Sequence, residues 1–231
     1  MRAGMSAIVL GLVGSTAGAT LAPTYEVARS VGDHDFLYAF RQSAEAVLTA
    51  PQDNVLSTWR PLPFTWKFFG KDVTGYFISD NGYITFDRNA KVSVAAPTAL
   101  TDAAAPKNSI FAYWTDLRLD AGQNQWTNNV STATLGAAPA RVHVIYWMSV
   151  APAGTAPAAS ALSFLVALHE NGEFEVVYTT VRKSAATAAT VGAVSADDVA
   201  RVTAAGPGFD FPAVGFGGED DVAFRFKPVE K

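Results

Sequence analysis

The 231-residue sequence contains no cysteine, which excludes disulfides, thiolate zinc sites, iron–sulfur clusters and cysteine nucleophiles. Charge is also scarce, at 16% of residues against roughly 25% in an average domain. The 17 basic and 21 acidic residues give a net charge of −4, and no lysine or arginine run occurs, so nucleic acid is not an expected partner. Hydrophobic residues make up 49% of the chain, which predicts a fold that is stabilised by a large packed core.

The N-terminus has the features of a secretion signal. Arg2 precedes an apolar run from Ala7 to Val13, and Ala17-Gly18-Ala19 provides the small residues that a signal peptidase accepts. We predict a signal peptide over residues 1–19 and a single domain over residues 20–231. The apolar run is shorter than the roughly 20 residues that span a bilayer, so no transmembrane segment is expected. The alternative, in which residues 1–19 form an ordered element that takes part in assembly, stays open.

Alternating hydrophobic residues predict β-strands along most of the chain. The pattern is clear in residues 62–68, 142–150, 162–168, 174–178 and 222–226. We therefore expect an all-β protein, a single antiparallel β-sandwich of jelly-roll type. One short helix is expected near residues 36–48, with Asp35 as its N-cap, while the alternation of Phe36, Tyr38 and Phe40 leaves a strand open as the alternative. Residues 127–139 are expected to form a loop.

Two hairpin turns can be predicted together with their registers. Asn171-Gly172 joins two alternating runs, and only a three-residue loop pairs apolar with apolar residues, placing Leu168 opposite Phe174. Asn81-Gly82 repeats the device, with Ile78 opposite Ile84. We expect Gly82 and Gly172 to adopt the left-handed conformation, which is inexpensive only for glycine.

Five blocks of sequence, in order, carry a resemblance to a known family. They are Leu62–Gly70 (LPFTWKFFG), Ile78–Phe86 (ISDNGYITF), Ile110–Leu117 (IFAYWTDL), Val142–Val150 and Ser163–Tyr178. Together they resemble the nidogen-type (NIDO-like) extracellular domain and its bacterial secreted relatives. The resemblance implies an extracellular β-sandwich used for adhesion or matrix association, with no catalytic residues to transfer.

Candidate site residues are few, because the minimal motifs of hydrolases, nucleotide-binding proteins and zinc proteases do not occur. Asp80, Asp116 and Asp120 are candidate oxygen ligands for calcium, or else Asp80 and Asp116 accept backbone hydrogen bonds within turns. A second candidate site is for a glycan. Trp126 lies in a polar stretch between Asn124 and Asn128, where an indole ring can stack on a sugar.

These features favour a secreted or cell-surface, non-catalytic adhesion or binding module. Its expected partner is an extracellular protein or a glycan, and calcium is the only cofactor considered. The first alternative is a self-associating structural subunit of an extracellular layer or filament, docking through sheet edges. The second is a glycan-active enzyme, which is disfavoured because no pair of acids projects inward from one strand face.

Overall fold

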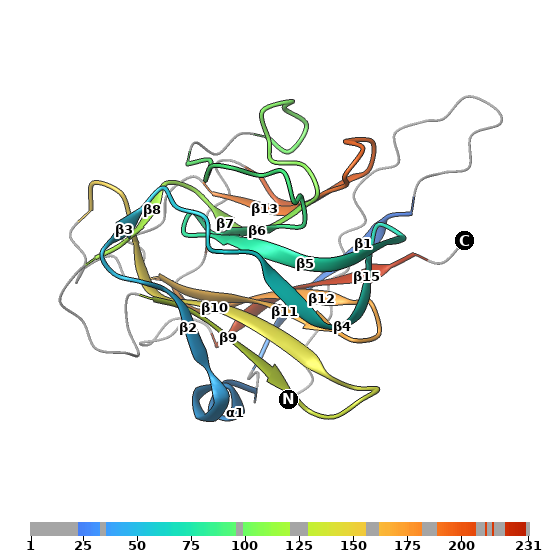
Figure 1. The fold of residues 1–231 in the computed structure, drawn as a ribbon, viewed down its shortest axis with the longest axis horizontal. Helices are drawn as coiled ribbons and strands as arrows, with labels where there is room; N and C mark the ends of the chain where they lie inside the picture. The colour runs from blue at the N-terminus through green and yellow to red at the C-terminus, as the bar shows by residue number, and fades with distance from the viewer. Residues whose placement is uncertain are drawn as a thin grey trace.

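The chain folds into two antiparallel β-sheets that pack face to face, as the computed structural model shows (Figure 1). The structure describes residues 23–32, 36–95, 99–120, 129–155, 162–181, 189–206, 211, 214 and 220–229, with the backbone alone for residues 36–38. The predicted all-β sandwich is therefore confirmed. The predicted signal peptide and Asp35 lie outside the described residues.

The larger sheet has nine strands in the described part of the chain, and the smaller sheet has six. The larger one consists of β1 (Tyr25–Val31), β15 (Val222–Pro228), β12 (Phe174–Val181), β11 (Leu162–His169), β10 (Val142–Pro152), β9 (Asn129–Leu135), β2 (Glu45–Thr49), β8 (Leu117–Leu119) and β3 (Gln52–Asp53). The smaller one, in spatial order, consists of β14 (Arg201–Ala205), β13 (Thr190–Val194), β7 (Ser109–Trp114), β6 (Tyr83–Thr85), β5 (Lys71–Ser79) and β4 (Arg60–Phe68). The sheets are large enough to bury a wide common face.

Both predicted hairpin registers are confirmed. Leu168 pairs with Phe174 across β11 and β12, and Ile78 pairs with Ile84 across β5 and β6. Gly172 and Gly82 have φ values of 94° and 77°, the left-handed conformation expected of them.

The main core lies between the two sheets and is rich in aromatic rings. Trp147 of β10 stacks on Phe164 of β11 at 5.2 Å, and Phe164 stacks in turn on Tyr113 of β7 at 5.5 Å, so one column of rings crosses from sheet to sheet. Polar bonds join the same layers, because Trp147 Nε1 donates to the Ser79 carbonyl at 2.9 Å and the Tyr178 hydroxyl donates to the Ala112 carbonyl. This packing fixes the sheets as one rigid scaffold.

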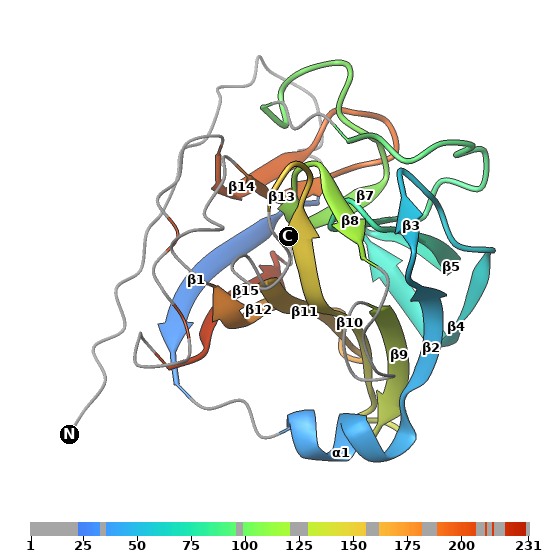
Figure 2. The ribbon, with the colours of Figure 1, turned by 90° about the vertical axis from the view of Figure 1, so that its left-hand side faces the viewer.

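The helix α1 (Phe36–Ser43) packs on the outer face of the larger sheet, next to β9 and β10 (Figure 2). Phe40 is fully buried and meets the ring of Tyr146 edge-to-face at 5.5 Å. The expected helix over residues 36–48 is therefore half right. Glu45–Thr49 is strand β2 because it pairs with β9, and Leu48 enters the main core.

Two further expectations are corrected. Residues 129–135 of the expected loop form strand β9, which is held between β10 and β2. Alternation in β10 predicts that Val144 and Tyr146 lie on the buried face and His143 on the opposite one. In the structure Val144 and Tyr146 lie in the cluster that contains Phe40 of α1, whereas His143, Ile145 and Trp147 face the main core. Both faces of this strand are covered, so alternation alone could not show which face is which.

Candidate functional site

An open groove lies at the end of the sandwich where two hairpin turns meet. Figure 1 shows the β4–β5 turn, the β11–β12 turn, the start of β1 and the end of β15 at the same end of the sandwich. Residues of these four segments line a hollow of about 390 Å³. The lining residues are Pro23, Thr24, Tyr25, Thr65, Trp66, Lys67, Phe69, Gly70, Glu170, Asn171, Gly172, Pro228 and Val229. The volume suits a few residues of a polypeptide or a short oligosaccharide.

The floor of the groove is aromatic and rigid. Tyr25 and Phe69 pack edge-to-face at 5.1 Å, and the Tyr25 hydroxyl accepts a hydrogen bond from Phe69 N at 3.4 Å. Burial raises the pKa of Tyr25 well above its usual value, so this phenol stays protonated. Trp66 Nε1 donates to the His169 carbonyl at 2.9 Å, which ties the smaller sheet to the β11–β12 turn. The two walls are thereby held at a fixed separation.

The rim carries polar groups that a ligand can reach. Lys67 is exposed and forms a surface ion pair with Asp72 at 2.7 Å. Glu170 is bound by Arg141 Nε at 2.9 Å and by Arg141 N at 3.1 Å, and the hydrogen bonds from Arg141 lower the pKa of Glu170. Asn171 is exposed, and its Oδ1 accepts from Glu173 N at 3.0 Å. The groove therefore offers an apolar floor, a cation and an amide, which suit binding by contact and hydrogen bonding.

The two predicted turns have different roles. Asn171 and Gly172 line the groove, whereas Asn81 and Gly82 lie inside the molecule. Asn81 is fully buried, and its Oδ1 accepts from Leu117 N at 2.8 Å. Its Nδ2 donates to Asn54 Oδ1 at 3.0 Å and to Ser93 Oγ at 2.7 Å. Asn81 thus joins three segments and has a structural role.

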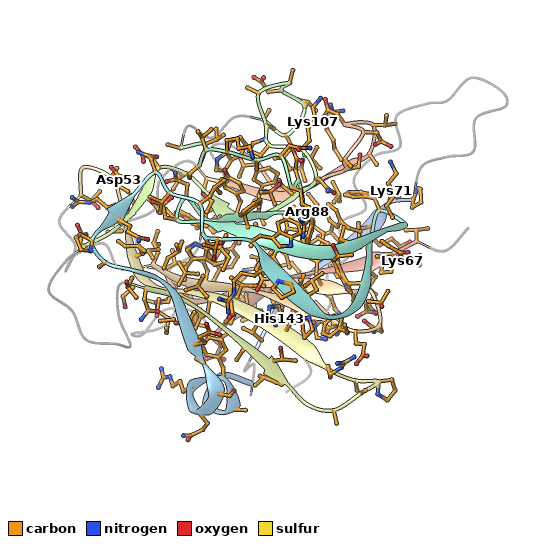
Figure 3. All side chains as sticks on the ribbon, in the orientation of Figure 1. Asp53, Lys67, Lys71, Arg88, Lys107 and His143 are labelled. Atoms are coloured by element: carbon orange, nitrogen blue, oxygen red, sulfur yellow. The ribbon has the colours of Figure 1, made fainter. Side chains whose placement is uncertain are left out.

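The predicted calcium ligands lie near Asp53, whose charge acts on Asp80 and Asp116, while Asp120 directly follows β8, which pairs with β3. Figure 3 shows Asp53 at the opposite end of the sandwich from Lys67, which lines the groove. Asp80 is fully buried, and its Oδ1 accepts from Val55 N at 3.0 Å and from Ser93 Oγ at 3.1 Å, so both of these bonds come from segments outside its own turn. Burial raises the pKa of Asp80 to about 6, and the charge of Asp53 adds to the rise. Burial also raises the pKa of Asp116, again with a contribution from Asp53.

Asp120 forms an ion pair with Arg118 at 3.3 Å. One carboxylate oxygen of each of Asp80, Asp116 and Asp120 is buried without a hydrogen-bond partner. The described part of the chain nevertheless contains no group of three or more carboxylates or imidazoles that could hold a metal ion. The structure therefore does not bring the three predicted calcium ligands together.

The predicted glycan contacts Asn124, Trp126 and Asn128 lie outside the described residues. The groove was missed at the sequence level because its residues come from four distant segments. Tyr25, Trp66 and Asn171 carry no shared local pattern, and the two aromatic residues read as core positions. Only the turn signal at Asn171-Gly172 pointed to this end of the molecule.

The fold is an all-β sandwich with an open groove at one end. The family described as NIDO related matches residues 24–210, and the chain belongs to this family. That membership indicates an extracellular binding-type module. Neither the curated proteins nor the solved structures returned a match. Within the described residues, no helix has the length and apolar character needed to cross a membrane.

Proposed function

We propose that this protein is a secreted or cell-surface adhesion module that binds an extracellular protein or glycan without catalysing a reaction. The observation that carries the proposal is the family match, which spans most of the chain. The groove supplies a place for the partner. Its floor is preorganised by Tyr25, Trp66 and Phe69, so little ordering of the protein opposes binding.

The proposal is tested by filling the groove without touching the core. Thr65 is exposed on β4 and lines the groove, so Thr65→Trp places an indole in the binding space. Thr203 is exposed on β14, the opposite edge strand of the same sheet, and Thr203→Trp is the matched control. The full chain and both variants are applied to an array of extracellular matrix proteins and glycans.

We expect the wild-type chain and Thr203→Trp to bind the same array member, and Thr65→Trp to lose at least tenfold in affinity. Equal binding by all three proteins would show that the groove is not the site. Absence of any binding by the folded wild type, or turnover of a glycan on the array, would contradict the function itself.

A further inference from the structure

One tryptophan differs from the others that the structure describes. Three of them are almost fully buried, and each donates its indole N–H to a backbone carbonyl at 2.8–2.9 Å: Trp66 to His169, Trp114 to Val94 and Trp147 to Ser79. Trp59 is only partly buried, and the described residues offer its Nε1 no hydrogen bond. Packing in the core therefore does not explain why part of the Trp59 side chain stays exposed.

The ring of Trp59 is held against the outer face of β5. A Cβ atom added at Gly75 would lie 2.6 Å from Trp59 Nε1, so the indole contacts the backbone of that glycine directly. Phe77, which points away from the core on the same strand, meets the indole edge-to-face at 5.0 Å. The position of the ring is thus fixed by β5 on the face that does not pack on the other sheet.

A guanidinium group lies over this ring. Arg88 Cζ is 4.5 Å from the centroid of the Trp59 ring, and Figure 3 shows Arg88 in front of β5. Arg88 is exposed and has no carboxylate partner among the described residues, and the same holds for Lys91 in the same loop. The neighbouring Asp87 directs an oxygen to Asn89 N at 2.9 Å.

Most other described basic side chains do have an acidic partner within 4 Å. They are Arg60, Lys67, Lys71, Lys107, Arg118, Arg141, Arg201 and Arg225. In a chain whose net charge is −4, an exposed guanidinium without a carboxylate partner in the described part of the chain, held over a partly buried indole, forms a local surface that is complementary to an anion.

We propose that Trp59, Phe77 and Arg88 form a binding site for an acidic glycan on the outer face of the smaller sheet. Trp59 holds the guanidinium of Arg88 in place, so that it can form paired hydrogen bonds to a uronate carboxylate or a sulfate. The partly exposed rings of Trp59 and Phe77 add apolar surface on which the C–H groups of the sugar can pack. None of these three residues lines the groove, so this proposal does not depend on the groove being the adhesion site.

The test uses calorimetric titration of the full chain with polygalacturonate at low salt. Neutral dextran and polyglutamate serve as control polymers. We expect the chain to bind polygalacturonate, and we expect this binding to weaken as NaCl is added. The Arg88→Gln variant should bind the polymer about tenfold more weakly, because it lacks one charge-assisted hydrogen bond. Trp59→Phe should retain more affinity than Trp59→Ala, because it keeps a ring beneath the guanidinium.

Two control variants separate this site from non-specific charge attraction and from the groove. Lys227→Gln removes an exposed cation on β15 that has no acidic partner among the described residues, and it should leave the affinity unchanged. Thr65→Trp should also leave it unchanged, since it fills the groove only. Polyglutamate binding as tight as polygalacturonate, with the same loss in Arg88→Gln, would overturn the proposal in favour of an acidic-peptide site. No binding of polygalacturonate, or an equal loss in Lys227→Gln, would overturn it as well.

Discussion

Gly82 and Gly172 occupy the same position in two three-residue turns, so they provide an internal comparison between backbone strain and packing. Both have positive φ, at 77° and 94°, and the left-handed conformation costs an alanine at either position about 1 kcal/mol. Their surroundings differ. A Cβ atom at Gly82 would lie 2.2 Å from the carbonyl oxygen of Tyr113, whereas at Gly172 the nearest atom is Pro228 Cγ at 3.8 Å.

The clash at Gly82 has no easy relief. Tyr113 is fully buried in β7, and its carbonyl is backbone, so no side-chain rotation can move it away. Separating the turn from β7 would also break the bonds that the Gly82 carbonyl accepts from Ala112 N at 2.9 Å and Tyr113 N at 3.0 Å. Each of those bonds contributes about 1 kcal/mol. We therefore expect Gly172→Ala to lower the free energy of unfolding by about 1 kcal/mol and Gly82→Ala to lower it by about 3 kcal/mol or more.

Urea denaturation followed by tryptophan fluorescence measures both values, with the m-value as a check that unfolding stays two-state. If Gly82→Ala is too unstable to purify while Gly172→Ala folds, the order is already as expected. Losses that agree within about 0.5 kcal/mol would contradict this prediction, because the contact with Tyr113 would then have no energetic effect.

Three further predictions concern the core and the buried ionisable groups. Phe40→Ala should lower the free energy of unfolding by about 3 kcal/mol in urea, since it empties the contact between α1 and Tyr146, whereas the exposed Arg41→Ala should change it by less than about 0.5 kcal/mol. Asp80 has its pKa raised to about 6, so its stabilisation is complete below pH 3.8 and is lost as the pH rises through 6; the wild type should lose up to about 3 kcal/mol relative to Asp80→Asn between pH 4 and pH 8. Parallel pH profiles for these two proteins would contradict the burial of that carboxyl. Burial lowers the pKa of His143 to about 4, so the neutral imidazole contributes to stability above pH 6.5 and this contribution is lost as the pH falls toward 4. Between pH 7 and pH 4 the wild type should therefore lose up to about 3 kcal/mol more in free energy of unfolding than His143→Gln, as measured by urea titrations at the two pH values.

The strand pattern and the hairpin registers could be predicted because they depend on local alternation and on turn chemistry. Leu168 and Ile78 have only one register that pairs apolar with apolar residues, and the structure adopts it. Strand β9 was missed because its pairing partners lie elsewhere in the chain, while Pro139, the end of the expected loop, lies just after it. Tertiary pairing decided that segment.

The assignment of faces failed in β10 for a related reason. Alternation identifies two sets of residues, but a strand that is covered on both sides buries both sets, so Tyr146 and Trp147 are both buried and a one-sided pattern cannot separate them. The groove depends on long-range contacts too. Trp66 and His169 are brought together only when the two sheets pack, and no sequence pattern reports that distance.

Hydrogen–deuterium exchange of the full chain, with and without the partner selected on the array, is the most decisive test of the groove as the adhesion site. We predict that binding slows exchange in the backbone around residues 65–72 and 169–173, which form the two walls of the groove. Protection confined to the far edge of the smaller sheet, around residues 191–205, would contradict that assignment.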